Sequence, residues 1–324
     1  VRAKNGNTLS PYKSTGTVKY NVTPTVKVSN ATSGIKVSWS TAANATGYRV
    51  YRSTLSNGKW SGWKNMGTAK ANKTAWTDKS VKTGVTYKYT VRAVYNKILS
   101  SYNKDGAVSL FLSTPTVKIA NIANGIQVKW NSVSGATGYI VYSSQFDPVT
   151  NKWSGWANRG TVTTTSWTDT TVKSGVTYRY TVRALNGNTL SAYKATGGLI
   201  YLAEPTVKIS NAAKGIKVKW SQCDGATGYT VYRSEYNSET KKWSKWKSRG
   251  TAAATKSSWT DKKVTSGKTY KYTVRAVNGN FKSSYVSTGS LLYLAQPTVT
   301  VKAVDNGINV AWTQCAGATG YRVY

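Results

Sequence analysis

One segment recurs along the chain almost unchanged and limits what the chain can fold into. It reads GVTYRYTVRAL at residues 175–185, with copies at 84–94 and 267–277. In the middle copy, Tyr178, Tyr180 and Val182 alternate with Arg179 and Arg183. A period of two is typical of a strand with one buried face and one face in solvent. The pattern therefore predicts a long, half-buried strand that is repeated.

The spacing of a second motif predicts the domain organisation. The sequence Pro-Thr-Val begins at Pro24, Pro115, Pro205 and Pro297, so the period is about 90 residues. That period is too long for a solenoid unit and suits a β-sandwich domain of about 100 residues. The expected units are residues 1–23, with the last two strands of a partial repeat, the complete repeats 24–114, 115–204 and 205–296, and residues 297–324, with the first three strands of another.

Alternation within the first complete repeat predicts further strands at 26–28, 34–39, 47–51 and 76–78. The polar segment 53–67 between them is expected to form a loop and an edge strand. The last strand of each repeat continues into the next proline without a Gly/Ser-rich spacer. Because flexible linkers need such a composition, we expect the repeats to form an extended, stiff rod.

The order of these signals resembles the fibronectin type III fold. A proline on the first strand, a tryptophan on the second, Tyr-x-Val on the third and Val-x-x-Gly-x-x-Tyr before the recurring strand carry the resemblance, which covers essentially the whole chain. It implies an all-β fold of tandem seven-stranded antiparallel β-sandwiches, immunoglobulin-like in architecture. One departure is a valine, at Val81, Val172 and Val264, where this family usually has leucine.

The resemblance also implies structural roles for two sets of aromatic residues. The second-strand tryptophans, expected in the core, are Trp39, Trp130, Trp220 and Trp312. The corner tyrosines, whose hydroxyls are expected to hydrogen-bond to the chain upstream, are Tyr87, Tyr178 and Tyr270.

The charge balance is strongly positive. Lys and Arg number 45 against 10 Asp and Glu, without histidine, for a formal net charge of +35. Such a surface attracts polyanions, and the candidate partners are anionic cell-wall polymers, host glycans or glycoproteins, and nucleic acid. Lysine is spread over every repeat instead of being clustered beside base-stacking aromatics, which indicates a general surface property that also keeps sheet edges from pairing.

The sequence offers no recognisable catalytic constellation. Without histidine there is no general base of ordinary pKa near neutrality, and the few carboxylates are scattered. Asp78, Asp169 and Asp261 recur in Trp-Thr-Asp and are expected to form turns with their own backbone. No phosphate-binding loop or metal-ligand cluster is present. Cys223 and Cys315 occupy the same position in successive repeats, and we expect that position to be small, buried and apolar. We therefore expect no enzyme activity and no cofactor.

The most distinctive motif is Lys-Trp-Ser-x-Trp. It occurs once in each complete repeat, and its tryptophans are Trp60 and Trp63, Trp153 and Trp156, and Trp243 and Trp246. If the third strand and the recurring strand are neighbours, as the family resemblance implies, cations lie on the face below: Arg49, Lys88, Arg92, Arg179, Arg183, Lys271 and Arg275. Tryptophan rings stacked on these cations would form a structural ladder. The motif also resembles the Trp-Ser-x-Trp-Ser box of cytokine receptor domains.

The same face has a second interpretation, as an aromatic platform that stacks sugar rings. We expect the chain to be the structural and adhesive stalk of a large extracellular or cell-surface protein, binding anionic polymers or host glycans weakly and repeatedly. A specific binding module for carbohydrate or a host glycoprotein such as immunoglobulin is the alternative, and nucleic-acid binding is a third. The near-identical Thr/Asn/Lys-rich repeats resemble arrays of gram-positive bacterial surface proteins.

Overall fold

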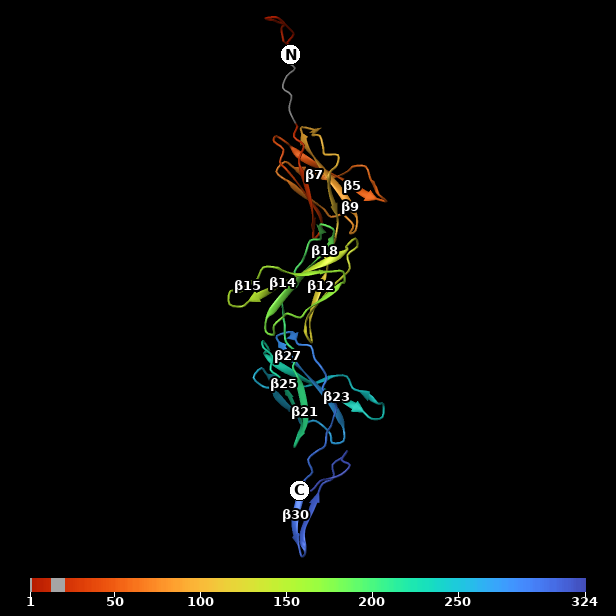
Figure 1. The fold of residues 1–324 in the computed structure, drawn as a ribbon, viewed down its shortest axis with the longest axis vertical. Coiled ribbons are helices and arrows are strands. Elements are labelled where there is room, and N and C mark those ends of the chain that lie inside the picture. Colours follow the sequence, from red (N-terminus) through yellow and green to blue (C-terminus); the bar gives the residue numbers. More distant parts are fainter. Residues whose placement is uncertain (1, 13–20) are drawn as a thin grey trace. The chain divides into compact units, whose positions relative to one another are not determined.

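A computed structural model describes residues 2–12 and 21–324 of this protein. The secondary structure assigned in these ranges is entirely β, without a helix (Figure 1). By its contacts the chain divides into two compact units, described separately below. Unit 1 comprises Val1–Thr114, Val133–Thr137 and Ala184–Ala192, and unit 2 comprises Pro115–Ser132, Gly138–Arg183 and Tyr193–Tyr324. The repeat boundaries expected from the prolines, and the rod, stay predictions.

The first complete repeat contains two sheets. Its three-stranded sheet has the order β3 (Val26–Ala31), β4 (Gly34–Trp39) and β8 (Ala75–Asp78). Its six-stranded sheet has the order β10 (Ile98–Leu99), β9 (Thr86–Tyr95), β5 (Gly47–Ser56) and β6 (Lys59–Trp60), with β7 (Lys64–Lys70) on β5 and β11 (Ala107–Leu110) on β9. The recurring segment is therefore a central strand, and β5 pairs with it along its length.

The second and third repeats have the same two sheets. In the second, the strands are β12 (Val117–Ile122), β13 (Gly125–Trp130) and β17 (Ser166–Asp169), then β14 (Gly138–Asp147), β15 (Lys152–Trp153), β16 (Ala157–Val162), β18 (Thr177–Asn186), β19 (Thr189–Leu190) and β20 (Leu199–Ile200). In the third, they are β21 (Val207–Ala212), β22 (Gly215–Trp220) and β26 (Ser258–Asp261), then β23 (Gly228–Asn237), β24 (Lys242–Trp243), β25 (Lys247–Ala253), β27 (Thr269–Asn278), β28 (Phe281–Lys282) and β29 (Leu291–Leu292).

The two ends of the chain contain shorter sheets. At the start, β1 (Lys4–Asn5) pairs with β2 (Thr8–Leu9), and the rest of the strand expected there, at 13–20, lies outside the described residues. At the end, β30 (Val299–Val304) pairs with β31 (Gly307–Trp312). The third strand expected before Tyr324 is not formed. In the third repeat its equivalent, β23, is held from both sides by β25 and β27, whereas residues 313–324 have no strand paired beside them in the structure.

The hydrophobic core of each complete repeat lies between its two sheets. In the first repeat, Ile35 and Val37 of the three-stranded sheet meet Val50 and Val91 of the six-stranded sheet, and all four are at most 1% exposed. Trp39 packs on Tyr48, with 5.4 Å between ring centroids. The second-strand tryptophans of the complete repeats are buried, whereas Trp312 in the partial repeat is 38% exposed.

The corner tyrosines make the same hydrogen bond in each complete repeat. The Tyr87 hydroxyl accepts a hydrogen bond from the backbone N–H of Lys82 at 2.8 Å. The equivalent bonds run to Tyr178 from Lys173 at 3.0 Å and to Tyr270 from Thr265 at 3.0 Å. Each bond spans five residues, so it fixes the turn that leads into the central strand.

Inside unit 2, the second and third repeats contact each other without a spacer. Ser174 Oγ donates a hydrogen bond to the Asp224 carbonyl at 2.8 Å. Beside it, Gly175 (φ +84°) and Gly225 (φ +77°) approach closely, so that a Cβ added to Gly225 would lie 2.3 Å from the Gly175 Cα. Within each unit the equivalent glycines also approach each other: Gly84 with Gly135, and Gly267 with Gly317. Glycine is required here for both its backbone conformation and its lack of a side chain.

We predict that Gly225→Ala loosens this contact. The left-handed backbone alone costs about 1–2 kcal/mol for alanine, and the clash with Gly175 adds to that cost. Gly279→Ala is the matched control, because Gly279 has φ +53° and nothing within 4 Å of its added Cβ. Hydrogen exchange of the full chain should be faster at 174–176 and 224–226 in the Gly225 variant only. Equal exchange at these segments in both variants would show that the close approach is not maintained in solution.

Candidate functional site

A cation lies between two tryptophan rings on the six-stranded sheet of each complete repeat. In the second repeat, the Arg179 guanidinium carbon is 4.3 Å from the Trp153 ring centroid and 4.8 Å from that of Trp156. The corresponding distances are 4.8 and 5.1 Å for Lys88 with Trp60 and Trp63, and 4.4 and 5.5 Å for Lys271 with Trp243 and Trp246. Both rings of each Lys-Trp-Ser-x-Trp motif therefore fold over one cation of the central strand.

A tyrosine extends each cation–aromatic stack, and sequence reasoning missed it. Trp156 meets Tyr193 edge-on at 6.2 Å, and Arg183 lies 5.8 Å from the Tyr193 ring. Tyr102 and Tyr285 have the same position, with Arg92 and Arg275 stacked on them at 5.4 and 5.5 Å. These arginines were expected under tryptophan and lie on tyrosine instead. The available signal was a tyrosine two residues after a recurring serine, as in Ser191-Ala192-Tyr193.

Arg49 shares the face of Arg92, as expected, but the tryptophans do not stack on it. It lies on β5 directly opposite Arg92 of β9, and the two tryptophans of the first repeat both stack on Lys88. The reason is the register of the short strand β6, which pairs Trp60 with Leu55 near the far end of β5. We call the stack of two tryptophans, two cations and one tyrosine in each repeat the ladder.

The serine of each motif fixes the ladder to the sheet. In the first repeat, Ser61 Oγ accepts a hydrogen bond from the Thr54 backbone N–H at 3.0 Å, and Ser53 Oγ donates one to the Ser61 carbonyl at 2.6 Å. The same pair of bonds joins Ser154 to Gln145 and Ser144, and Ser244 to Glu235 and Ser234. The serine side chain thus bonds to the neighbouring strand where the regular sheet hydrogen bonds end. This contact holds the segment between the two tryptophans in place.

A buried carboxylate lies at the end of β8, in the three-stranded sheet that faces the central strand. Asp78 is 1% exposed, and its Oδ2 accepts hydrogen bonds from Tyr89 at 2.9 Å and from Arg52 at 2.7 Å. Its Oδ1 accepts one from the Ser80 backbone N–H at 2.9 Å, which is the turn expected from the sequence. Tyr180 bonds Asp169 and Tyr272 bonds Asp261 in the same way, at 2.9 and 3.1 Å. Sequence reasoning found the turn but not the buried network.

The network changes the acidity of its members. Burial acts to raise the pKa of the Asp78 carboxyl, but the hydrogen bonds from Ser80, Arg52 and Tyr89 outweigh it and hold the pKa below its ordinary value. Burial, followed by the neighbouring aspartate charge, raises the pKa of Tyr89, Tyr180 and Tyr272 far above the usual range. These groups remain a carboxylate and neutral phenols at ordinary pH, which suits a structural role.

Small depressions open beside the ladder in two repeats. One has a volume of about 120 Å³ and is lined by Trp63, Tyr102 and Arg92, and the other, also about 120 Å³, by Trp156, Tyr193 and Arg183. The ladder tryptophans are only partly covered, and Trp60 is 37% exposed. The face can therefore offer ring surface to a ligand even though its cations are stacked.

Two sheets enclosing one core, a tyrosine corner and repetition define the class of fold: repeated β-sandwich sheets that match tandem fibronectin type III domains. No family model matches the chain. It is 25% identical over 295 residues to human fibronectin type III domain-containing protein 7, covering 89% of this chain and 37% of the relative. It is 28% identical over 201 residues to exoglucanase B of Cellulomonas fimi, covering 52% of this chain and 16% of the relative. The chain thus spans well under half the length of these relatives.

Solved structures with similarity include other repeated modules. The FN1-FN3 domains of chicken CNTN1 share 15% identity with this chain at a TM-score of 0.27, covering 85% of this chain and 99% of that one. A two-domain fibronectin type III segment of chicken tenascin shares 16% identity at a TM-score of 0.31, covering 56% and 99%. Among the residues described for the present chain, no helix has the length and apolar character needed to cross a membrane.

We predict that Asp78→Asn destabilises the first repeat. Removing one partner of a buried ion pair costs about 3–5 kcal/mol. The single amide oxygen of asparagine cannot accept from Ser80 on one side and from Arg52 and Tyr89 on the other, as the two carboxylate oxygens do. The Asp78 pKa is lowered by folding, so its stabilisation is complete above the unfolded pKa of about 4 and is lost as pH falls through the folded value. Hydrogen exchange at pH 7 should therefore show lost protection in 86–95.

The intact second and third repeats are internal controls for this prediction, and the gap between variant and parent should narrow at low pH. Asp105→Asn, at an exposed carboxylate, is the matched variant expected to have no effect. Unchanged protection of β9 in the Asp78 variant would contradict a stabilising role for the network.

Proposed function

We propose that this chain is a non-catalytic structural and adhesive array, part of a large extracellular surface protein of bacterial type. In this proposal it binds anionic polymers or host glycans weakly and many times over. Fibronectin type III domains are typically non-catalytic, extracellular modules. The observation that carries the proposal is the ladder, because all three complete repeats present the same outward face of stacked rings and cations.

The ladder supports the structural half of the proposal. Each sandwiched cation contributes about 0.5–2 kcal/mol per ring. Stacking also covers the outer face of the central strands with aromatic side chains. Because this arrangement recurs in every complete repeat, it favours a role of the chain as a stable spacer.

The charge supports the adhesive half. The chain has a formal net charge of +35, and most of its lysines lie outside the ladder. Individually weak contacts add through multivalency when sites repeat along one chain. Anionic polymers, whose charges also repeat, are the ligand class that such a surface suits best.

A specific carbohydrate or host-glycoprotein site is the second candidate function. The depressions of about 120 Å³ between tryptophan and tyrosine favour it, because rings and hydrogen-bonding groups meet there. Arg92 and Arg183 lie at their edges.

Changing Trp63, Trp156 and Trp246 to Ala together separates the two candidate functions. The structural ladder predicts a loss of about 1–3 kcal/mol in each repeat, from lost stacking and burial. Urea unfolding followed by circular dichroism measures this loss, and a glycan panel measures binding. Unchanged stability with lost binding to a neutral glycan would overturn the ladder and favour the platform. Lost stability without any lost glycan binding excludes the platform.

The adhesive function predicts steep salt dependence. We expect the full chain to be retained on immobilised heparin and on polygalacturonate at 50 mM NaCl, and released by about 200 mM, because counterions displaced on binding compete with the lysines. Duplex DNA of matched charge density tests the nucleic-acid alternative and is expected to bind no better. Failure to bind either polysaccharide at low salt, or binding undiminished at high salt, contradicts the proposal.

A further inference from the structure

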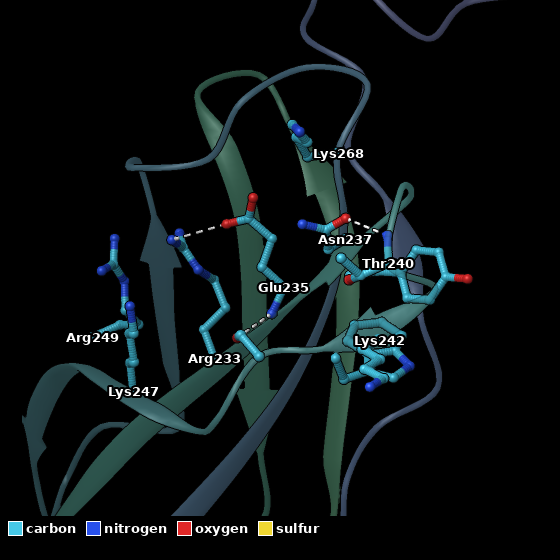
Figure 2. A pocket seen from close by; sticks show the side chains of 11 residues that line it. Arg233, Glu235, Asn237, Thr240, Lys242, Lys247, Arg249 and Lys268 are labelled. Carbon is cyan, nitrogen blue, oxygen red and sulfur yellow. Dashed lines mark hydrogen bonds and ion pairs between the residues drawn. The ribbon is translucent and has the colours of Figure 1, made fainter.

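The third repeat contains a cavity beside its ladder, with the ladder residue Trp243 in its lining. It has a volume of about 470 Å³ and lies between the β23–β24 hairpin and β25 (Figure 2). Its lining includes five cationic side chains: Arg233, Lys242, Lys247, Arg249 and Lys268. Tyr236 and Trp243, packed at 5.3 Å between ring centroids, form an aromatic wall of the same cavity.

The carboxylates near this cavity do not neutralise its cations. Arg233 bonds the buried Asp261 at 2.9 Å, and Arg249 lies 3.9 Å from the same carboxylate. Glu235 lies 3.9 Å from Arg233 and is itself 40% exposed. Of the residues that line the cavity, Glu235 is the one carboxylate against five cations, and Lys242, Lys247 and Lys268 are exposed to solvent. A surplus of positive charge in a concave site concentrates anions there.

The other two repeats lack this combination. At the positions of Lys247, Arg249 and Lys268, the first repeat has Lys64, Met66 and Val85, and the second has Ala157, Arg159 and Val176. The hairpin differs as well. Where the third repeat has Asn237, the second has Asp147, whose carboxylate bonds Thr150 at 2.8 Å, and the first has Ser56 before a tight turn at Asn57-Gly58. The full set of cations therefore occurs only in the third of the complete repeats.

The layout of the cavity indicates what kind of anion fits. Figure 2 shows Glu235 in the middle, with Arg233, Arg249 and Lys247 to one side of it and Asn237 and Lys242 to the other. Asn237 Oδ1 accepts hydrogen bonds from the backbone N–H groups of Glu239 and Thr240, both at 2.9 Å, which turns its amide nitrogen towards Glu235. A central carboxylate repels one compact polyanion but accepts hydroxyl donors, so the cavity suits hydroxyl groups flanked by separate negative groups.

We propose that this cavity is a binding site for an anionic oligosaccharide, with its sulfate or carboxylate groups on Arg249, Lys247 and Lys268. Arginine and lysine bind such groups through charge-assisted hydrogen bonds. Hydroxyl groups of the sugar donate to Glu235, and a ring packs on the aromatic wall. This inference rests on the proposed adhesive function and deepens it, because it assigns one preferred site to an otherwise diffuse surface.

The test is calorimetric titration of the full chain with a size-defined heparin hexasaccharide. One hexasaccharide should bind per chain. The variant Lys247→Ala/Arg249→Met/Lys268→Val carries residues already found at these positions in the other repeats, so its fold is preserved. Its affinity should fall at least about tenfold, the loss expected for charge-assisted contacts.

The matched control is Lys208→Ala/Lys214→Ala/Lys219→Ala. These exposed lysines lie on β21, β22 and the turn between them, in the other sheet of the same repeat, and their loss lowers the net charge by the same amount. Hexasaccharide affinity should change by less than about threefold, through long-range charge alone. Equal losses in the two variants would overturn the cavity site and leave diffuse adhesion standing. Absence of all polyanion binding would instead remove the proposed function itself.

Two further measurements define the ligand and the site. A galacturonate hexasaccharide and a DNA hexanucleotide distinguish the source of the anion, and equal dependence of DNA and heparin binding on the cavity residues would overturn the saccharide assignment. The variant Thr54→Glu/Leu55→Tyr/Met66→Arg/Val85→Lys gives the first repeat the residues found at the equivalent positions of the third-repeat cavity. It should raise the stoichiometry from one to two hexasaccharides per chain, and an unchanged stoichiometry counts against the proposed set of five cations, Glu235 and Tyr236.

Discussion

The structure depends on the two different faces of one strand. Inward, the recurring strand places a corner tyrosine, a second tyrosine and valines in the core, as with Tyr178, Tyr180 and Val182. On its outward face, the strand places two cations four residues apart, as with Arg179 and Arg183, and the aromatic rings of the ladder stack on them. Burial therefore fixes the register of the strand, and the register fixes where the aromatic rings of a distant motif have to lie.

The ladder and the cavity divide the positive charge of the chain into two kinds. Arg179 and its equivalents are held between rings, and their charge contributes to the stability of the fold. Lys247 and Lys268 have no such rings above them in the third repeat and remain exposed. The same residue type thus serves as a structural element on the central strand and as a ligand-binding group beside β25.

Much of this fold could be predicted from the sequence, because period-two alternation and repetition are local signals. The buried strands follow from these signals. The corner tyrosines and the stacking of Trp153 and Trp156 on Arg179 followed from the resemblance to the fibronectin type III fold. The tyrosine at 193 was missed because it lies on an irregular segment without periodicity. The buried Asp78 network was missed because its turn accounted for the aspartate locally, whereas Arg52 reaches it from another sheet. The cavity depends on contacts among three separate segments, which no single pattern reveals.

The central claim is that ladder cations stabilise the fold while cavity cations bind the anionic ligand. Lysine acetylation of the full chain, quantified by mass spectrometry with and without a sulfated hexasaccharide, tests it directly. Lys88 and Lys271 should react slowly in both conditions, and Lys247 and Lys268 should react fast alone and slowly with the saccharide. Protection of Lys88 and Lys271 by the saccharide, with Lys247 and Lys268 unaffected, would contradict the account.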